Sequence, residues 1–303
     1  MRLLLVYQKI NLILIQLQGG LGNQMFQYAF GKALSLEYGC RLKVDVGFLK
    51  ANANDEDGFT AREYELDIFD TYIKTASSKL VSSFEKENYF KKILHRFKLP
   101  YKKVYHESKL STQEEIAQIR PPVLLIGYWQ SESFFIKYSD RIRKEFVFKN
   151  AAGKVDAVLK AKMSQVHSVS VHIRRGDYVT NRVANDVLGI LDMKYYAAAM
   201  ELMNSKVDNA FYFFFSDDPA WVRSQFGHLP NSIVVDQNGA ENHDADMYLM
   251  SRCRHSIIAN SSFSWWGAWL NDDINKIVIA PKLWNKNSQF SNHKLIPADW
   301  YLI

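Results

Sequence analysis

The stretch that decides the fold reads VSVHIRRGDY and occupies residues 169–178. Its first five residues predict a strand that ends at Ile173, followed by two arginines, a glycine and an aspartate. Other short apolar runs predict strands at 12–17, 42–46, 123–126, 211–215, 233–235, 256–259 and 277–280. Strands that alternate with helices indicate an α/β fold with parallel sheets covered on both faces. Because ligands of such sheets bind at the carboxyl ends of strands, the polar residues after Ile173 are candidates for a site.

Helices and a domain boundary follow from the same patterns. Apolar residues recur at helical spacing over 25–34, and Gly39 is a typical stop signal. Further helices are expected at 132–146, 194–202, 244–252 and 263–270. A boundary is expected within 149–166, which gives an N-terminal domain over 1–150 and a C-terminal domain over 151–303. A C-terminal tail that packs back on the N-terminal domain is compatible with this division.

Composition and charge predict a packed, basic globular protein. Of 303 residues, 48% are hydrophobic and 23% are charged. The net charge of +6 favours an anionic partner such as a nucleotide, and no nucleic-acid-binding signature is present. Cys40 and Cys253 lie in no CxxC or Cys/His cluster, so neither a disulfide framework nor a zinc site is indicated. Polar residues interrupt 1–17, which predicts neither a membrane-spanning helix nor a signal peptide.

Arg174 and Arg175 leave the predicted strand together, and two such charges are costly to bury without partners. A diphosphate would satisfy them, because a guanidinium binds phosphate oxygens in bidentate fashion and keeps its charge. Gly176 would let the backbone approach such a ligand closely. The alternative is a structural pair between an arginine and Asp177 at the strand end.

Two acids, Asp217 and Asp218, follow the apolar run at 211–215 and precede Pro219. They could be metal ligands, acceptors for a base or ribose edge, or a helix N-cap before a proline at the first helical position. The pair lacks Asp-x-Asp spacing and has no other acid or histidine close in sequence, so a metal is the least favoured reading. We expect one acid to bind the nucleotide, the other to cap the helix, and no metal.

The segment ANSSFSWWG at 259–267 leads from a strand end through a hydroxyl-rich turn into a helix. A helix N-terminus offers free N–H groups and a favourable dipole to an anion, and the serines add further donors. This pattern predicts a phosphate-binding turn without the glycines of a Walker loop. The alternative is a serine-capped helix packed by its tryptophans.

A glycine turn, QGGLGNQ, follows the first predicted strand at residues 18–24. Its spacing differs from GxGxxG, and Asp45 is a weak match for a ribose-binding acid, which argues against a dehydrogenase. The pattern instead favours a glycine turn whose Asn23 amide faces a cleft between the two domains.

Residues 90–99 form a basic amphipathic pattern, with an apolar face made by Phe90, Ile93, Leu94 and Phe97. Such a helix can lie on an anionic membrane, although a core-facing stripe with solvated lysines explains the same pattern. We expect a cytoplasmic protein, with peripheral contact to the inner face of the cell membrane as the open alternative.

Three of these motifs together resemble the α-1,2-fucosyltransferases of glycosyltransferase family 11, bacterial members in particular. They are GGLGNQMFQYA at 19–29, HIRRGDY at 172–178 and NSSFSWW at 260–266, in the order expected for the family. The resemblance implies a GT-B-like α/β fold of two Rossmann-like domains whose parallel sheets face each other across a cleft. It also implies inverting transfer of L-fucose from GDP-β-L-fucose to the 2-hydroxyl of a terminal β-galactoside, without a metal or other cofactor.

The resemblance assigns roles to single residues. Arg174 would bind the β-phosphate, and Ser261 and Ser262 would donate hydrogen bonds to the diphosphate. The stretch Gly22-Asn23-Gln24 would face fucose and acceptor. The predicted catalytic set comprises Arg174, Asn23 and Asp177, the last as the best-placed acid for a base. The predicted nucleotide-binding set comprises His172, Arg174, Asp217, Asp218, Asn260, Ser261, Ser262, Phe263 and Gly22.

Within the nucleotide-binding set, His172 and one of Asp217 and Asp218 would recognise guanine, as in the similar α-1,6-fucosyltransferases. Residues 46–120 match no motif, and acceptor choice is expected to depend on them. Two alternatives stay open: another linkage, such as α-1,6 transfer or protein O-fucosylation, and a non-catalytic protein that binds a nucleotide or a glycan. The acceptor and the oligomeric state do not follow from the sequence.

Overall fold

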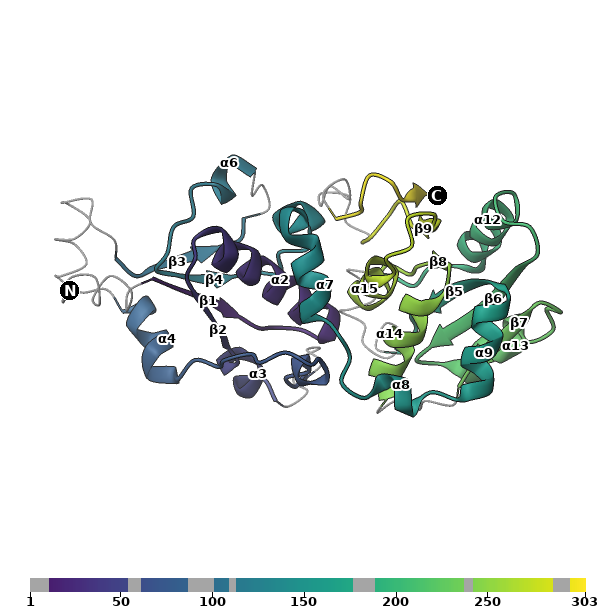
Figure 1. Cartoon of the computed structure of the whole chain (residues 1–303), viewed down its shortest axis with the longest axis horizontal. Helices are drawn as coiled ribbons and strands as arrows, with labels where there is room; N and C mark the ends of the chain where they lie inside the picture. Colours follow the sequence, from purple (N-terminus) through teal and green to yellow (C-terminus); the bar gives the residue numbers. More distant parts are fainter. Residues whose placement is uncertain are drawn as a thin grey trace. The chain divides into compact units, whose positions relative to one another are not determined.

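The computed structural model describes residues 11–53, 61–86, 101–108, 113–176, 189–236, 242–285 and 295–303. These residues form two compact α/β units, of which the first ends at Val147 and the second begins at Phe148. Each unit contains one sheet, and every strand pairing in both sheets is parallel, as the alternating pattern predicts (Figure 1).

The first unit begins with a strand, a glycine turn, a helix and a second strand. Its strands are β1 (Leu12–Gln16), β2 (Arg41–Asp45), β3 (Lys103–His106) and β4 (Val123–Ile126), in the spatial order β2-β1-β4-β3. Its helices are α2 (Leu21–Glu37), α3 (Gly47–Ala51), α4 (Ser78–Glu85), α6 (Gln113–Ile116) and α7 (Ser139–Glu145), with 3-10 turns η1 (Leu66–Ile68), η2 (Glu132–Phe134) and η3 (Ile136–Tyr138).

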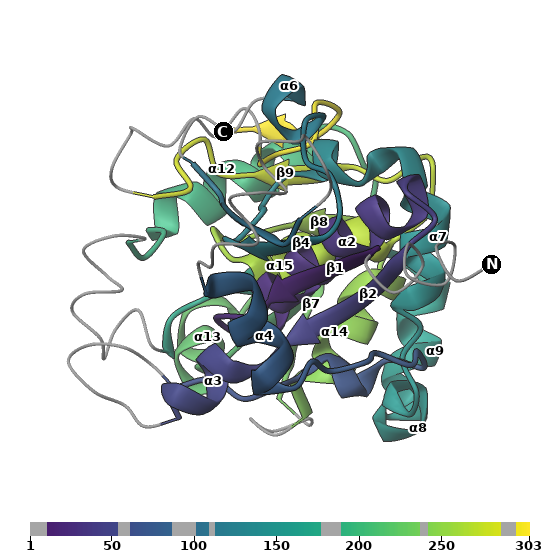
Figure 2. The same cartoon turned by 90° about the vertical axis from the view of Figure 1, so that its left-hand side faces the viewer.

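Alternate residues of β1 serve the two faces of this sheet. Leu14 packs with Val81 and Phe84 of α4. Ile15 lies under α2, where a Cβ added at Gly31 would come within 3.2 Å of it. Because neighbouring side chains of a strand point to opposite faces, α4 and α2 cover opposite sides of the sheet (Figure 2). The strand is therefore apolar on both faces.

The second unit holds the larger sheet. Its strands are β5 (His167–Ile173), β6 (Ala210–Ser216), β7 (Ser232–Val235), β8 (His255–Ile257), β9 (Val278–Ala280) and β10 (Tyr301–Leu302), in the order β10-β9-β8-β5-β6-β7. Its helices are α8 (Ala151–Lys154), α9 (Ala157–Gln165), α12 (Met193–Asn204), α13 (Pro219–Phe226), α14 (His243–Arg252) and α15 (Ser262–Leu270).

Helices cover both faces of this sheet as well. Val171 and Ile173 pack into a core with α12 and α13, whereas Phe213 and Phe215 of β6 pack with α9 and α14. His172 alternates with Ile173 and pairs in register with Phe215, so it lies on the α14 side. The strand that carries the arginine motif is thus fixed from two sides.

The helix predicted over 132–146 is wrong as a single element. The chain forms the two short turns η2 and η3, and only then the helix α7. The interruption is at Phe135, whose φ of −140° is not helical and whose buried ring lies 6.3 Å from that of Phe26. Burial of this ring overrides the continuous helical pattern. The short strands β3 and β10 were not expected from the sequence.

Candidate functional site

Three predicted motifs lie beyond the ends of three adjacent strands in the second unit. In the order β8-β5-β6, Arg174 directly follows β5, Asp217 directly follows β6, and Ser261 follows β8 by four residues. Since these strands are parallel, all three positions lie at the carboxyl edge of the sheet. The chain moves to one side of β5 through β6 and β7 and then to the other through β8. Ligands of open α/β sheets bind at such a switch point.

Arg174 is held by the first acid of the Asp-Asp pair. Its Nη1 atom lies 2.9 Å from Oδ2 of Asp217, and both side chains are partly buried. Oδ1 of the same carboxylate accepts the backbone N–H of Arg175 at 2.8 Å. A Cβ added at Gly176 would stand 2.5 Å from Oδ2 of Asp217, so only glycine leaves room for this carboxylate. The guanidinium of Arg174 is therefore oriented without a ligand.

Arg175 is held by the second acid of the pair. Its Nε donates to Oδ2 of Asp218 at 3.1 Å, and its guanidinium lies 3.9 Å from the centre of the Trp221 ring. Oδ1 of Asp218 accepts the backbone N–H of Trp221 at 3.1 Å and so caps α13, with Pro219 at the helix start. The predicted helix cap is thus found at Asp218.

His172 is buried at the end of β5, with its ring 5.5 Å from that of Phe263. Its Nδ1 has no hydrogen-bond partner among the described residues. Burial lowers the pKa of His172 to about 4, with Asp217 acting in the opposite direction and Arg174 adding to the decrease. The imidazole is therefore neutral at neutral pH, with one ring nitrogen able to donate and the other able to accept.

The serine-rich turn leads into α15, as the sequence predicts. Ser261 is the N-cap residue, with extended backbone, and its side chain makes no capping hydrogen bond. The hydroxyl of Ser264 donates backward to the carbonyls of Ala259 and Ser261 at 3.2 and 3.0 Å. Since the Ser261 side chain does not cap the helix, the first turn has N–H groups and the positive end of the helix dipole at this strand end. At the other end, the Lys276 ammonium donates to the carbonyl of Ala268 at 3.0 Å.

Asn260 is buried and joins two loops beside this turn. Its Nδ2 donates to the carbonyls of Gly189 and Trp284 at 3.0 and 3.2 Å. Nearby, the Tyr195 hydroxyl on α12 donates to the carbonyl of Ile258 at 2.6 Å. These contacts fix the path of the chain between β8 and α15, so the amide nitrogen of Asn260 supports the turn from within.

Gly22 and Asn23 belong to the first unit, whereas the other described site residues belong to the second. Gly22 is buried in the first turn of α2. Oδ1 of Asn23 accepts a hydrogen bond from Nε2 of Gln130 at 2.6 Å. Gly19 adopts a φ of +74°, and a Cβ there would approach Nδ2 of Asn23 to 2.4 Å, so glycine is required at this position.

Two buried glutamines brace the same glycine turn. Nε2 of Gln24 donates to the carbonyls of Gly19 and Glu63 at 2.9 and 2.7 Å. Gln27 exchanges hydrogen bonds with the backbone of Gln18 and also donates to Gly127 at 3.1 Å. Gln27 and Trp221 are absent from the predicted site, whereas Gln24 belongs to the stretch expected to face fucose and acceptor. Spacing offered a signal for Trp221 alone, since the third residue after an N-cap aspartate lies in the first turn of the helix.

Asp177 and residues 90–99 lie outside the described residues. In the described part of the chain, no helix is long and apolar enough to cross a membrane. The same residues contain no group of three His, Cys, Asp or Glu side chains that could hold a metal ion.

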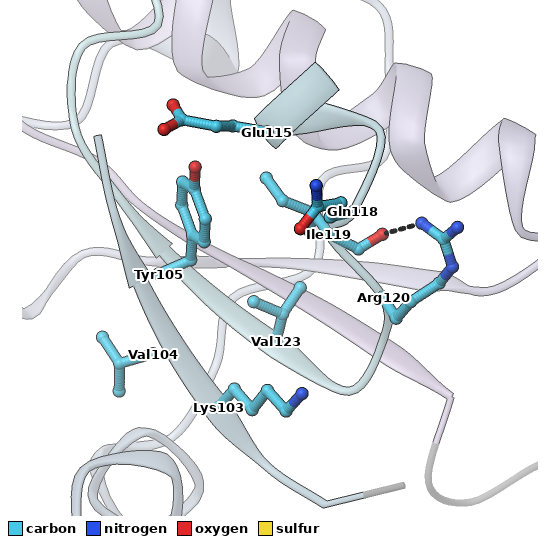
Figure 3. Close-up of a pocket in the computed structure, with 8 residues that line it drawn as sticks. All are labelled: Lys103, Val104, Tyr105, Glu115, Gln118, Ile119, Arg120 and Val123. Atoms are coloured by element: carbon cyan, nitrogen blue, oxygen red, sulfur yellow. Dashed lines mark hydrogen bonds between the residues drawn. The ribbon is translucent and has the colours of Figure 1, made fainter. Parts of the chain in front are cut away.

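A cavity of about 320 Å³ lies in the first unit, between strands β3 and β4 and the segment that follows α6. Figure 3 shows Tyr105 and Val123 from these strands opposite Glu115 and Gln118. None of the predicted site residues lines it. The carboxyl edge of the β5 sheet, and not this cavity, gathers the predicted chemistry.

Comparison with known proteins identifies the family of the chain. The sequence profile described as Glycosyl transferase family 11 matches residues 5–303. An Escherichia coli alpha-1,2-colitosyltransferase is 32% identical over 317 aligned residues, which cover 97% of this chain and 99% of that protein. The galactoside alpha-(1,2)-fucosyltransferase 2 of Rattus norvegicus is 29% identical over 49% of this chain and 44% of its own.

The fold has a counterpart among solved structures. The NodZ alpha-1,6-fucosyltransferase soaked with GDP-fucose aligns with a TM-score of 0.50 and 14% identity, over 86% of this chain and 92% of that one. A likeness at this identity concerns the fold, which is the predicted GT-B-like α/β architecture of Rossmann-like units. The family match spans nearly the whole sequence and contains all three motifs. The chain therefore belongs to glycosyl transferase family 11.

Proposed function

We propose that the protein transfers L-fucose from GDP-β-L-fucose to the 2-hydroxyl of a terminal β-galactoside, with inversion to an α-1,2 linkage. The observation that carries the proposal is the placement of Arg174 at the end of β5, with the start of α15, where the Ser261 side chain makes no capping hydrogen bond, following the adjacent strand β8. Membership in family 11 supports the reaction class, and the named fucosyltransferase relative supports the sugar and the galactoside acceptor.

The cationic groups of the site suit a diphosphate leaving group. Negative charge grows on the β-phosphate as its bond to the sugar breaks. Arg174 would exchange Asp217 for a phosphate oxygen. The N–H groups at the start of α15 would donate hydrogen bonds to other oxygens of the leaving diphosphate. Fixed donors of this kind contribute about 3–4 kcal/mol each to transition-state stabilisation. A guanidinium and a helix dipole supply this charge in the protein itself, which supports a reaction without a metal.

The guanine base is assigned to His172 and Asp217. Burial lowers the pKa of His172, so its imidazole is neutral at neutral pH. A neutral imidazole can form a hydrogen bond with the uncharged edge of a base. Asp217 is freed from Arg174 when phosphate takes its place, and a carboxylate accepts from the guanine N–H groups. Asp218 is occupied by the helix cap and by Arg175.

Inversion requires the acceptor hydroxyl to attack from the side opposite the diphosphate. Asp177 remains our proposed base, and Asn23 of the first unit remains assigned to the sugar side. Oδ1 of Asn23 is oriented by Gln130, so its Nδ2 donor has a fixed direction. The acceptor hydroxyl would lose its proton late, as the bond to the anomeric carbon forms.

The decisive experiment is turnover of GDP-fucose with a β-galactoside acceptor by wild type and Arg174→Ala. We expect kcat/KM to fall roughly 100- to 1000-fold because one preorganised donor to the leaving group is lost. Arg223→Ala is the matched control, since this exposed arginine of the same unit pairs with Asp236 on the surface. Near wild-type turnover by Arg174→Ala with an unchanged melting temperature contradicts the assignment. Linkage analysis of the product decides between α-1,2 and other linkages.

A second donor is favoured by one observation. One relative that matches over nearly its whole length is named an alpha-1,2-colitosyltransferase, and colitose is L-fucose without the 3-hydroxyl. A site that hydrogen-bonds a sugar hydroxyl rejects the deoxy analogue by roughly 10⁴-fold or more, whereas a site without that bond does not. Competition between GDP-fucose and GDP-colitose at equal concentration therefore identifies the donor from the ratio of the two products.

A further inference from the structure

Arg175 is enclosed more completely than its neighbour Arg174. The central carbon of its guanidinium lies over the Trp221 ring, 3.9 Å from the ring centre, and its Nε donates to Asp218 at 3.1 Å. The side chain is only 19% exposed. Its surroundings are an aromatic face and a carboxylate of the protein itself, and both belong to the start of α13.

Asp218 connects this guanidinium to the helix with its two oxygens. Oδ2 accepts from Arg175, while Oδ1 accepts the backbone N–H of Trp221 at 3.1 Å. The Ser216 hydroxyl accepts the N–H of Asp218 at 3.0 Å, which fixes the carboxylate relative to the end of β6. The loop after β5 is thereby attached to the first turn of α13.

The backbone of Arg175 completes a connection to Arg174. Its N–H donates to Oδ1 of Asp217 at 2.8 Å, and Oδ2 of that carboxylate holds the guanidinium of Arg174 at 2.9 Å. The side chain of Arg175 therefore fixes the loop, and its backbone fixes the carboxylate that orients its neighbour. Both connections pass through adjacent residues of the same turn.

We propose that Arg175 is a positioning residue, which Trp221 and Asp218 hold so that the loop presents Arg174 to the diphosphate of the donor. This inference rests on the proposed function and adds Trp221 to the residues on which the reaction depends. Lysine cannot replace Arg175 in this role, because a compact ammonium neither stacks flat on an indole nor donates sideways from Nε. Phenylalanine at 221 retains an aromatic face, whereas leucine does not.

The test compares Trp221→Leu, Trp221→Phe, Arg175→Ala and the double variant Arg175→Ala/Trp221→Leu. We expect Trp221→Leu and Arg175→Ala each to lower kcat with GDP-fucose by at least about tenfold, because a displacement of about 1 Å in a catalytic group has an effect of this order or larger. Trp221→Phe should retain most of the activity. The double variant should be no worse than Arg175→Ala alone, since the two residues act through one contact.

Tyr301→Leu is the matched control, because it removes the ring that Lys206 approaches to 4.2 Å at another surface of the same unit. It should leave kcat unchanged, and melting temperatures identify variants that merely unfold. If Trp221→Leu is as active as wild type while Arg175→Ala is inactive, Arg175 binds the donor directly and the inference is overturned. Failure of the proposed function is separate: it is recognised when the wild-type protein itself turns over no GDP-fucose with a β-galactoside acceptor.

Discussion

Gly176 shows how little space separates the arginine motif from the acid pair. A single Cβ at this position would come within 2.5 Å of Oδ2 of Asp217. The sequence predicts a glycine that allows close approach of a ligand. The structure shows a glycine that allows close approach of a carboxylate of the protein itself, and that carboxylate orients Arg174.

Gly176→Ala should therefore displace Asp217 and misplace Arg174. We expect kcat/KM for GDP-fucose to fall roughly 10- to 100-fold, as expected for a catalytic group moved by about 1 Å. Gly153→Ala is the control, because a Cβ there meets nothing within 4 Å. Steady-state kinetics of both variants decide the point. Equal activity of the two would show that the carboxylate moves without consequence.

His172 gives the site a dependence on pH that can be measured as stability. Its pKa is about 4 in the fold because burial disfavours the charged imidazolium. The unfolded chain takes up a proton near pH 6.5, and the folded chain does so only near pH 4. The free energy of unfolding should therefore fall as the pH drops through this window, by up to about 1.4 kcal/mol per pH unit.

Urea unfolding of wild type and His172→Gln at pH 7.5, 6 and 5 isolates this contribution. Other groups titrate in both proteins, so the informative quantity is the difference between the two stabilities. That difference should shift in favour of the variant as the pH falls. A stability difference that is constant with pH would show that His172 takes up its proton at the same pH in the folded and the unfolded chain.

The residue scale is also where sequence reasoning was most limited. The motif VHIRRGD predicts a strand end with cationic side chains, and the Asp-Pro sequence predicts a helix cap. The pairing of Arg174 with Asp217 joins residues that are far apart in sequence, so no local pattern contains it. The stacking of Arg175 on Trp221 has the same character, because it depends on β5 and β6 being neighbours.

At the scale of secondary structure, the loops at the carboxyl ends of strands are fastened by buried side chains. In the first unit, Gln27 of α2 bonds to the backbone of Gln18 after β1 and of Gly127 after β4. One amide thus links a helix to the ends of two adjacent strands. A buried amide of this kind is costly to replace because its partners lose their hydrogen bonds.

Gln27→Met, which preserves length and removes the amide, should destabilise the protein by about 1–3 kcal/mol. Gln118→Met is the control in the same unit, since Gln118 is exposed and its replacement should stay within about 0.5 kcal/mol. Denaturant midpoints of both variants test the prediction. A midpoint for Gln27→Met that matches the control would mean that water replaces the lost donors and acceptors.

Regular elements were largely predictable, and the reasons for the exceptions are physical. The strands at the centre of each sheet are apolar on both faces, so their sequence periodicity identifies them. The helix α2 ends at Glu37 close to Gly39, whose φ of +57° fits the predicted stop signal. The break at Phe135 was not predictable, because it depends on where its ring is buried. β3 and β10 are edge strands, and each is too short for its pattern of apolar residues to identify it as a strand.

At the scale of the whole molecule, the predicted chemistry is divided between two units. Apart from Gly22, the described residues that we assign to the nucleotide belong to the second unit, and the glycine turn belongs to the first. The predicted domain division at 150 stays a prediction about the folded protein. The two units should therefore respond differently to a bound nucleotide.

Hydrogen exchange with and without GDP should show protection in the second unit, at the strand ends near 173, 217 and 260. The reason is that these segments contain the side chains and helix N–H groups assigned to the nucleotide. The glycine turn at 18–24 should change less when GDP is present without a sugar or acceptor. Protection confined to the first unit would contradict the assignment of donor and acceptor sides.

Chelation is a second test at this scale. If Arg174 and α15 provide the charge that stabilises the diphosphate, activity with GDP-fucose should persist within about twofold after treatment with EDTA. Re-addition of Mg²⁺ or Mn²⁺ to the treated protein is the control. An activity that disappears with the chelator and returns with the ion would require a metal in the reaction.

The interlocked contacts of Arg175, Asp218 and Trp221 also bear on how this enzyme can be redesigned. A library that varies these positions one at a time removes one partner while the other two keep side chains fitted to it, so most single substitutions other than Trp221→Phe would score as losses. Substitutions that work together are reached only when the three positions are randomised as one block. A search for altered donor preference should therefore vary the three positions together. The effect of a substitution at one of them depends on the residues at the other two, which is epistasis.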